Sequence, residues 1–365
     1  MRKNIYIIIL IYSLFYISTN WAQTNKNTSK IKFYGDVRLR TELDRDSKKA
    51  NGEMRPDRDR FRFRFNLAFQ YLLNRNIELG SGIRTGNPDN PQSSNVTIGD
   101  GFSNEDLSID KAYIKYHSGD FYIWGGKNKI NLWEPDEMLW DADVHPEGIG
   151  VGQLFKWHDN LQMQFNGGFF LLTDNLIENN KQTFDNQENI SFAQFKFAGQ
   201  KSGYKWVFAP GIMHAYMTAS VGYNYNIFMN FLSLENDQWH VHIDYFKNFE
   251  DLNQKVDRAL QDEKSGYSLT GTYRINKLSL KVSYAHIEKY AVIDRFAQDN
   301  WVRWSGDNMT RSSNFGGIGL GLKYQISNQI QSQIKYWKVE GLQKASYETA
   351  LETGTRIRWD LKIKF

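Results

Sequence analysis

The stretch Arg58-Asp-Arg-Phe-Arg-Phe-Arg-Phe-Asn-Leu-Ala-Phe-Gln-Tyr71 alternates between polar and apolar side chains. The polar phase comprises Arg58, Arg60, Arg62, Arg64, Asn66 and Gln70, and the apolar phase comprises Phe61, Phe63, Phe65, Leu67, Phe69 and Tyr71. Because successive side chains of a strand point to opposite faces, this pattern predicts a strand with one cationic and one aromatic face. In a soluble protein the aromatic face would be core. In a closed membrane barrel it would face lipid, and the arginines would face a water-filled lumen.

Residues 355–365 repeat the alternation at the other end of the sequence. The apolar phase comprises Ile357, Trp359, Leu361, Ile363 and Phe365, and the polar phase comprises Arg356, Arg358, Asp360, Lys362 and Lys364. This segment, which stops on an aromatic residue, resembles the terminal strand by which bacterial outer-membrane proteins are recognised for assembly. It favours the membrane barrel over a soluble β-sandwich.

The first residues carry the pattern of a secretory signal peptide. Arg2 and Lys3 precede an apolar run over residues 5–17, and Ala22 is a suitable last residue before cleavage. No other stretch approaches the eighteen apolar residues that a membrane helix needs. The predicted organisation is a signal peptide over residues 1–22 and one outer-membrane β-barrel over residues 23–365.

Composition fits this class. Mean hydropathy is only −0.60, yet aromatic residues make up 15% of the chain, as expected when polar side chains face the lumen and aromatics face lipid. The absence of cysteine rules out a disulfide framework. The formal net charge of +4 gives no support to nucleic-acid binding.

The order of segments predicts an all-β fold, a transmembrane antiparallel up-and-down β-barrel of about 16 strands. The strands are expected at 31–43, 58–71, 76–86, 108–116, 120–127, 149–157, 161–172, 189–197, 204–214, 217–234, 238–246, 266–274, 278–287, 315–324, 330–338 and 355–365. Short turns alternate with longer polar loops, with one short exception at residues 215–216. The alternation is least clear within residues 204–234, which makes the strand count there the weakest part of the prediction.

Several segments of the first half occur in an order that is typical of a known family. They are Phe33-Tyr-Gly-Asp-Val-Arg-Leu-Arg40, the arginine-rich stretch, Gly82-Ile-Arg-Thr-Gly-Asn-Pro88, Ile109-Asp-Lys-Ala-Tyr-Ile114 and Trp140-Asp-Ala-Asp-Val-His-Pro-Glu-Gly148. Together they resemble the "putative porin" family of Gram-negative outer membranes, well over residues 33–150 and by strand pattern beyond. Alginate-export-type barrels share the Asp-x-Ala-Tyr element and are the nearest competitor. The resemblance implies a passive diffusion channel.

Seven arginines on the first three strands share the lumen phase and are predicted to form one basic wall. They are Arg38, Arg40, Arg58, Arg60, Arg62, Arg64 and Arg84. Strands lie about 4.8 Å apart, so these guanidiniums would be neighbours, and Asp36, Glu42 and Glu78 would partly neutralise them. The wall would attract anions and bind carboxylate or phosphate. Alternatively, it is a structural ladder that only fixes strand register.

The loop over residues 128–148 is the candidate constriction loop. Its acidic residues are Glu134, Asp136, Glu137, Asp141, Asp143 and Glu147, and it also carries apolar Trp133, Leu139, Trp140 and Val144. A long loop with hydrophobic anchors is expected to pack against something. We expect it to fold into the lumen with its acids facing the arginine wall, which would create a transverse field. A solvated surface loop, or a calcium site at Asp136, Asp141 and Asp143, are the alternatives.

An enzyme embedded in the barrel is another functional class to weigh. His240, His242 and Asp244 share a face, but a polar lumen wall brings such groups together by chance, and no nucleophile-elbow or zinc motif is present. The prediction is a channel without catalytic residues, cofactor or metal.

The predicted function is an outer-membrane porin that allows passive diffusion of small hydrophilic, anionic solutes. The alternatives are a specific channel or exporter for an anionic poly- or oligosaccharide and, less favoured, a barrel-embedded hydrolase. The expected partners are outer-membrane lipid and the solutes, without nucleic acid. A homo-oligomer stays open, because the sequence shows no interface that can be separated from lipid-facing surface.

Overall fold

The computed structural model describes residues 30–99, 104–158, 160–172, 177–178, 181–182, 188–301, 305–306, 309–310 and 312–365. The expected signal peptide lies outside these residues. Within them, the one helix is the short α2 (Thr218–Val221), and no helix is long and apolar enough to cross a membrane.

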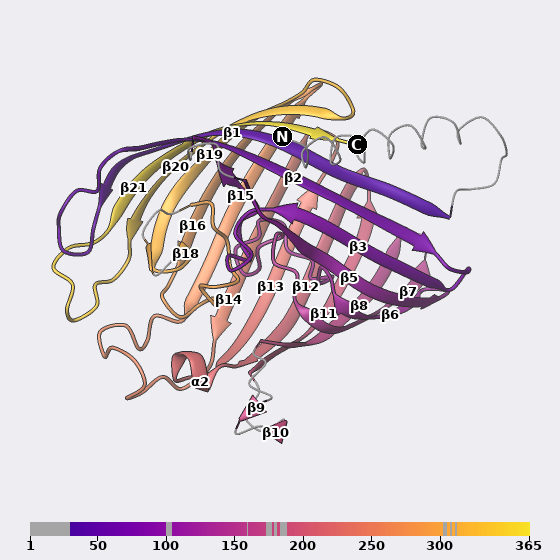
Figure 1. The fold of residues 1–365 in the computed structure, drawn as a ribbon, viewed down its shortest axis with the longest axis horizontal. Coiled ribbons are helices and arrows are strands. Elements are labelled where there is room, and N and C mark those ends of the chain that lie inside the picture. The colour runs from indigo at the N-terminus through magenta and orange to yellow at the C-terminus, as the bar shows by residue number, and fades with distance from the viewer. Residues whose placement is uncertain are drawn as a thin grey trace.

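The strands form a closed antiparallel barrel (Figure 1). Its wall consists of β1 (Ile31–Lys48), β2 (Arg58–Leu72), β3 (Ile77–Thr85), β5 (Leu107–Ser118), β6 (Phe121–Lys127), β7 (Glu147–His158), β8 (Leu161–Leu171), β11 (Asn189–Lys201), β12 (Tyr204–Tyr216), β13 (Tyr225–Glu235), β14 (Trp239–Asn248), β15 (Ser265–Ile275), β16 (Leu278–Ile287), β19 (Phe315–Gln325), β20 (Ile330–Gly341) and β21 (Thr353–Lys364). Each strand pairs with its sequence neighbours, and β21 pairs with β1 from Asp36 opposite Lys364 onward, which closes the ring. The prediction of a sixteen-stranded barrel is confirmed.

Five two-residue strands lie outside the wall. β4 (Val96–Thr97) pairs with β2, β9 (Ile177–Glu178) pairs with β10 (Lys181–Gln182), and β17 (Ser305–Gly306) pairs with β18 (Met309–Thr310). They belong to the loops that join wall strands.

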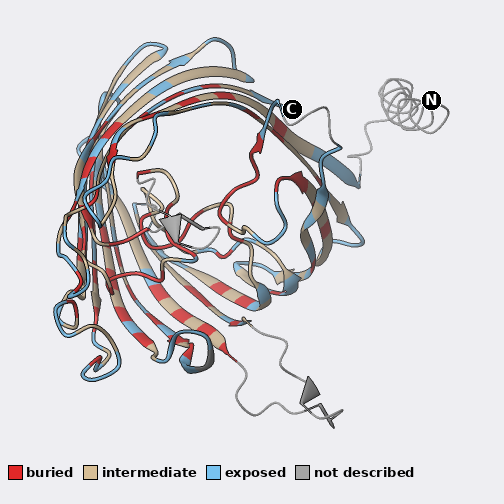
Figure 2. Ribbon diagram, turned by 60° about the vertical axis from the view of Figure 1, so that its left-hand side comes forward, coloured by how far each residue is buried: buried red, intermediate tan, exposed pale blue. Residues whose placement is uncertain are grey.

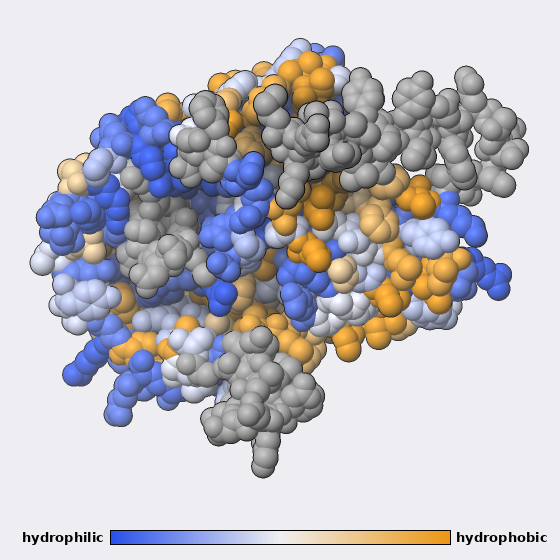
Figure 3. Space-filling view, in the orientation of Figure 1, coloured by the Kyte–Doolittle hydropathy of each residue, from blue (hydrophilic) through white to orange (hydrophobic). Residues whose placement is uncertain are grey.

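The arginines of β2 point into the barrel and its phenylalanines point outward, as the barrel interpretation requires. Arg62 and Arg64 are only 8% and 6% exposed, whereas Phe61 and Phe69 are 44% and 37% exposed. A water-soluble fold would show the opposite burial, because apolar surface leaves water most readily. Figure 3 shows apolar residues over the strands, and polar residues gathered at the end that carries the β1–β2 and β20–β21 loops.

Long and short connections alternate strictly around the ring. The short ones are residues 73–76, 119–120, 159–160, 202–203, 236–238, 276–277 and 326–329, and the long ones are 49–57, 86–106, 128–146, 172–188, 217–224, 249–264, 288–314 and 342–352. The expected short link at residues 215–216 is therefore wrong, since β13 begins at Tyr225 rather than at residue 217. Residues 217–224 form a loop in which Gly222 (φ +84°) caps the C-terminal end of α2, in a left-handed conformation that glycine adopts without strain.

The interior differs from the expectation of an aqueous lumen along the whole wall. Segments within the ring of strands are coloured as buried in Figure 2, and a hydrophobic cluster joins wall strands to loops inside the barrel. Its wall members include Phe170, Ile190, Met213, Met229, Phe231 and Phe246, and its loop members include Met138, Leu139, Trp140, Val144, Ile293 and Phe296. Part of the wall therefore packs against loops on its inner side.

Candidate constriction site

Three long connections meet inside the barrel. They are the constriction loop (residues 128–146, between β6 and β7), the β3–β5 loop (residues 86–106) and the β16–β19 loop (residues 288–314), which meets the other two through residues 288–301. The constriction loop and the β16–β19 loop share a backbone hydrogen bond from Asp141 N to Phe296 O of 2.7 Å. The β3–β5 loop joins them through Gln92, whose side-chain amide donates to the carbonyl oxygen of Ala297 at 2.6 Å.

Apolar side chains hold the constriction loop in place. Met138 and Leu139 are 1% exposed. Trp140 stacks on Phe296 with ring centroids 5.4 Å apart. Large buried aromatic side chains dominate packing energies at interfaces of this kind. The loop is thus part of the barrel interior, as its apolar residues indicated.

One end of the loop is fixed by hydrogen bonds to buried polar groups. The side chain of Gln194, on β11, accepts from Trp133 N at 2.8 Å and donates to Trp133 O at 3.0 Å. The Glu134 carboxylate accepts from the backbone N–H groups of Leu139 and Trp140. Burial and the nearby charge of Asp244 nevertheless raise the pKa of Glu134 well above its usual value. Glu134 therefore caps a turn of the loop and does not face the arginine wall.

Asp136 contacts the wall at β14–β16, again away from the arginines. Its carboxylate lies 2.7 Å from His242 Nε2 and also contacts Thr270 Oγ1 and Lys281 Nζ. Burial opposes ionisation, yet the contacts with His242 and Lys281 leave the pKa of Asp136 below its ordinary value. Asp136 is therefore an anionic anchor.

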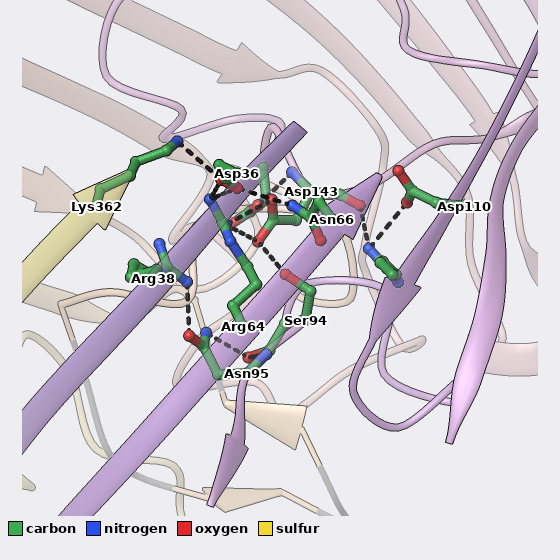
Figure 4. Close-up of polar contacts among 12 residues, drawn as sticks. Asp36, Arg38, Arg64, Asn66, Ser94, Asn95, Asp110, Asp143 and Lys362 are labelled. Carbon is green, nitrogen blue, oxygen red and sulfur yellow. Dashed lines mark hydrogen bonds and ion pairs between the residues drawn. The ribbon is translucent and has the colours of Figure 1, made fainter. Parts of the chain in front are cut away.

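Asp143 anchors the other end of the loop to β2 and β3, and Figure 4 shows it beside Arg64 of β2. Arg64 Nη1 lies 3.4 Å from its carboxylate, and Arg84 Nη1 donates to its backbone oxygen at 2.7 Å. Burial alone would raise the pKa of Asp143, but the charges of Arg64, Arg38 and Arg84 lower it. The loop thus spans from β14–β16 to the basic wall.

Most of the predicted arginine wall is ion-paired. The closest contacts are Arg40 with Asp360 (2.6 Å), Arg58 with Asp44 (2.7 Å), Arg60 with Glu42, Arg64 with Asp36 (2.6 Å) and Arg84 with Asp110 (3.4 Å). Arg38 and Arg62 have no carboxylate within ion-pair distance among the described residues, and both donate to Asn95 of the β3–β5 loop instead. The wall thus combines ion pairs, which the ladder alternative requires, with two arginines that have no carboxylate within ion-pair distance among the described residues.

A cavity of about 260 Å³ lies between the basic wall and the loops. Arg38, Arg40, Arg64, Lys335, Asp360 and Lys362 line it from the wall, and Asn95, Glu137, Asp141, Asp143, Asp299 and Asn300 line it from the three loops. Arg58, Arg60, Arg62 and Arg84 are not among its lining residues. The wall side is mainly basic, and the loop side is acidic.

Two loop acids at this cavity resist ionisation. Burial, followed by the charges of Asp299, Asp143 and Glu137, raises the pKa of Asp141 well above its usual value. Burial and the charge of Asp143 raise the pKa of Glu137. Both shifts arise because burial and neighbouring like charges disfavour the ionised carboxylate.

The remaining predicted residues lie elsewhere. Glu147 begins β7, is exposed and pairs with Lys127 at 2.9 Å. The three aspartates of the calcium alternative do not come together, since Asp136 lies against His242 while Asp141 and Asp143 line the cavity.

Sequence reasoning missed Asp299 and Asn300. They belong to a loop whose inward fold is signalled only by the apolar residues Val292, Ile293 and Phe296.

Comparison with known proteins agrees with this architecture. The family described as "Putative porin" matches residues 47–230, just over half of the chain. No curated protein matches. Among solved structures, Salmonella typhi OmpF in complex with daunomycin is similar at a TM-score of 0.59 and 10% identity, covering 94% of this chain and 99% of that one.

Two further solved structures show the same fold. A loop L8 deletion mutant of OmpT, an outer-membrane protein of Vibrio cholerae, has a TM-score of 0.52 and 11% identity, covering 92% and 99% of the two chains. A double mutant of the Rhodopseudomonas blastica porin has a TM-score of 0.51 and 10% identity, covering 92% and 100%.

Proposed function

Because the chain belongs to the "Putative porin" family and is an integral porin of the outer membrane, we propose that its interior cavity is the narrowest part of the path for small hydrophilic solutes. We further propose that this constriction favours anions over cations. Signal-peptide cleavage after residue 22, contact with outer-membrane lipid and a homo-oligomeric state belong to the same proposal.

The arrangement of charge across the cavity carries this proposal. Basic side chains come from β1, β2, β20 and β21, whereas acidic side chains come mainly from the loops. Opposed charges in a narrow aqueous space produce a transverse field, which aligns water and polar solutes and disfavours apolar ones. A solute with an anionic and a polar end can satisfy both sides at once.

The anion preference follows from the protonation of the loop acids. Five basic and five acidic side chains line the cavity, so full ionisation would give no net charge. The raised pKa values of Glu137 and Asp141 make these two acids the first to become neutral as the pH falls. The cavity then carries net positive charge, and Arg38, which has no acidic partner, becomes its strongest anion contact.

Single-channel recording in a planar bilayer under a salt gradient tests the proposal. We expect stable conductance steps, a reversal potential that reports a modest anion preference, and block by small dicarboxylates from either side. Conductance with cation preference would contradict the selectivity. Passage of an anionic oligosaccharide with little effect on the current would favour the saccharide-channel alternative, because a path of that width is incompatible with so small a constriction.

Deletion of the loop tip separates the loop's role from that of the barrel. A variant that lacks residues 134–145 keeps every wall strand and loses three acids that face the basic side chains, so it is expected to conduct more and to change its ion selectivity. Unchanged conductance in this variant would show that the constriction lies elsewhere.

A further inference from the structure

A cluster of donor groups lies where the constriction loop meets the wall at β14. One ligand atom each from Asp136, His242 and Asp244 lie within 4.8 Å of one another. Asp136 comes from the loop, whereas the other two residues share the inner face of β14. Their side chains are almost completely buried: Asp136 is 3% exposed, His242 4% and Asp244 0%.

Three buried atoms of the cluster make no hydrogen bond within the described part of the chain: His242 Nδ1, His242 Nε2 and Asp244 Oδ1. Of these, only Nε2 lies against an opposite charge, the Asp136 carboxylate at 2.7 Å. The second oxygen of Asp244 accepts from Ser268 Oγ at 3.1 Å, and this neutral hydroxyl does not balance the carboxylate charge. Buried polar groups normally have partners, and a group without one calls for an ion or a ligand. The unsatisfied atoms therefore point to a site that can bind a cation.

We propose that Asp136, His242 and Asp244 form a binding site for a divalent transition-metal ion, with one imidazole and two carboxylate ligands. Imidazole nitrogen combined with carboxylate oxygen suits Zn²⁺ better than Ca²⁺ or Mg²⁺, which prefer oxygen alone. Zinc bonds to nitrogen and oxygen are about 2.0–2.2 Å long, so two ligands of one ion lie up to about 4 Å apart, and small side-chain rotations suffice to close the site. Water from the lumen would complete the coordination.

Lys281 competes with the metal. Its ammonium group contacts Asp136 Oδ1, whereas the oxygen nearest to His242 is Oδ2. The lysine side chain is 39% exposed, so it can swing towards the lumen while Oδ2 binds the ion. The positive charges of Lys281 and the metal ion repel each other, because both would lie next to the Asp136 carboxylate. The lysine therefore lowers the affinity for metal without blocking the site.

Metal binding would fasten the constriction loop to β14. The ion would link a loop residue to two wall residues at the end of the loop that lies away from the arginine wall. Such a cross-link restrains the loop without entering the charged cavity. Zn²⁺ is therefore expected to stabilise the barrel against denaturant and to reduce flickering of the channel current.

Calorimetric titration of Zn²⁺ into tag-free refolded protein tests the site, with Ca²⁺ as the oxygen-preferring comparison. One zinc ion is expected to bind per chain, and more tightly than Ca²⁺. His242→Asn and Asp244→Asn should each weaken zinc binding at least about tenfold, the scale set by loss of even an indirect metal contact. Lys281→Met should strengthen binding, because it removes a competing positive charge. His214→Ala is the matched control, since this histidine pairs with Asn226 outside the cluster.

X-ray absorption at the zinc edge of the wild-type protein keeps the proposal falsifiable where a variant does not fold. One imidazole and oxygen ligands are expected. Absence of zinc binding by the wild type, binding that survives His242→Asn, equal affinity for Ca²⁺, or a zinc spectrum without imidazole would each overturn the proposal.

Discussion

Two parts of the barrel wall have inner faces of opposite chemical character, one charged and one apolar. The basic wall on β1, β2 and β3 adjoins the inner face of β21, and most of the charged side chains on these strands form ion pairs, such as Arg358 with Glu42 at 2.5 Å. The apolar wall, formed by the inner faces of β8 and β11–β14, carries buried Met213, Met229 and Phe231. The first surface faces the cavity, and the second is covered by the constriction loop.

This difference indicates that hydrophobic packing holds the constriction loop inside the barrel, and that ion pairs only set its orientation there. Burial of apolar side chains stabilises the folded loop and does not depend on the orientation of the contacting groups. Ion pairs that remain in contact with water contribute little to stability. The apolar wall therefore provides the holding energy, and contacts such as Arg64 with Asp143 select the register of the loop across the cavity.

Removal of the Trp140 side chain should disrupt the packing of the constriction loop and cause the largest loss of stability among these predictions. Trp140 is 6% exposed and stacks on Phe296, so Trp140→Ala is expected to lower the free energy of unfolding by about 3–5 kcal/mol. The loosened loop should also increase single-channel conductance. Urea unfolding in lipid vesicles and bilayer recordings measure the two effects.

Trp157→Ala is the matched control for this change. Trp157 is 54% exposed on the outside of β7, so its removal leaves no cavity inside the barrel. Equal losses of stability in the two variants, or unchanged conductance in Trp140→Ala, would show that packing does not position the loop.

Loss of the Glu42 carboxylate should disrupt ion pairs of the basic wall and lower the stability by a somewhat smaller amount. Glu42 is fully buried between Arg60 and Arg358, and Glu42→Gln leaves both guanidiniums without their carboxylate. Breaking a buried ion pair costs about 3 kcal/mol or more, although water in the lumen reduces this figure. The same urea experiment measures this loss of stability. Glu53→Gln is the matched control, because it removes only an exposed i,i+4 ion pair with Lys49, and it should change the free energy of unfolding by under about 1 kcal/mol.

The two walls also differ in how well the sequence predicts them. On β1 and β2 charged and aromatic residues alternate, so the phase of the strands was predictable residue by residue. On β12 and β13 both faces are mainly apolar, because the outer face meets lipid and the inner face meets the loop. Alternation disappears there, so the sequence predicts a strand from residue 217, whereas β13 begins eight residues later, at Tyr225.

The candidate site was predictable only in part for a related reason. The apolar residues of the constriction loop indicate that it packs, but they do not indicate against which strands. Glu134 and Asp136 were expected to face the arginines and instead contact their own loop and β14–β16. Contacts such as Arg356 with Asn300 O join distant parts of the chain, and no local pattern encodes them.

Ion selectivity should depend on pH through the acidic side of the cavity. Asp141 and Glu137 have raised pKa values, so they become neutral at a higher pH than ordinary carboxyl groups. Anion preference is therefore expected to increase as the pH falls from alkaline to acidic, and to decrease as the acids ionise. Reversal potentials across a pH series measure this change. Asp141→Asn should give a flatter profile that is anion-preferring at high pH, and a wild-type profile without slope would contradict the assignment.

The smallest effect compares two arginines within the basic wall. Arg38 lines the cavity and Arg62 does not, although both donate to Asn95 and neither has a carboxylate partner among the described residues. Since a unit charge about 4 Å from an ion in water is worth about 1 kcal/mol, Arg38→Gln should reduce the anion-to-cation permeability ratio by roughly fivefold or less. Arg62→Gln removes the same charge from the neighbouring strand and should leave the ratio nearly unchanged. Equal reductions would mean that solutes sense the summed charge of the wall, and the cavity at Arg38 would then have no special part in selectivity.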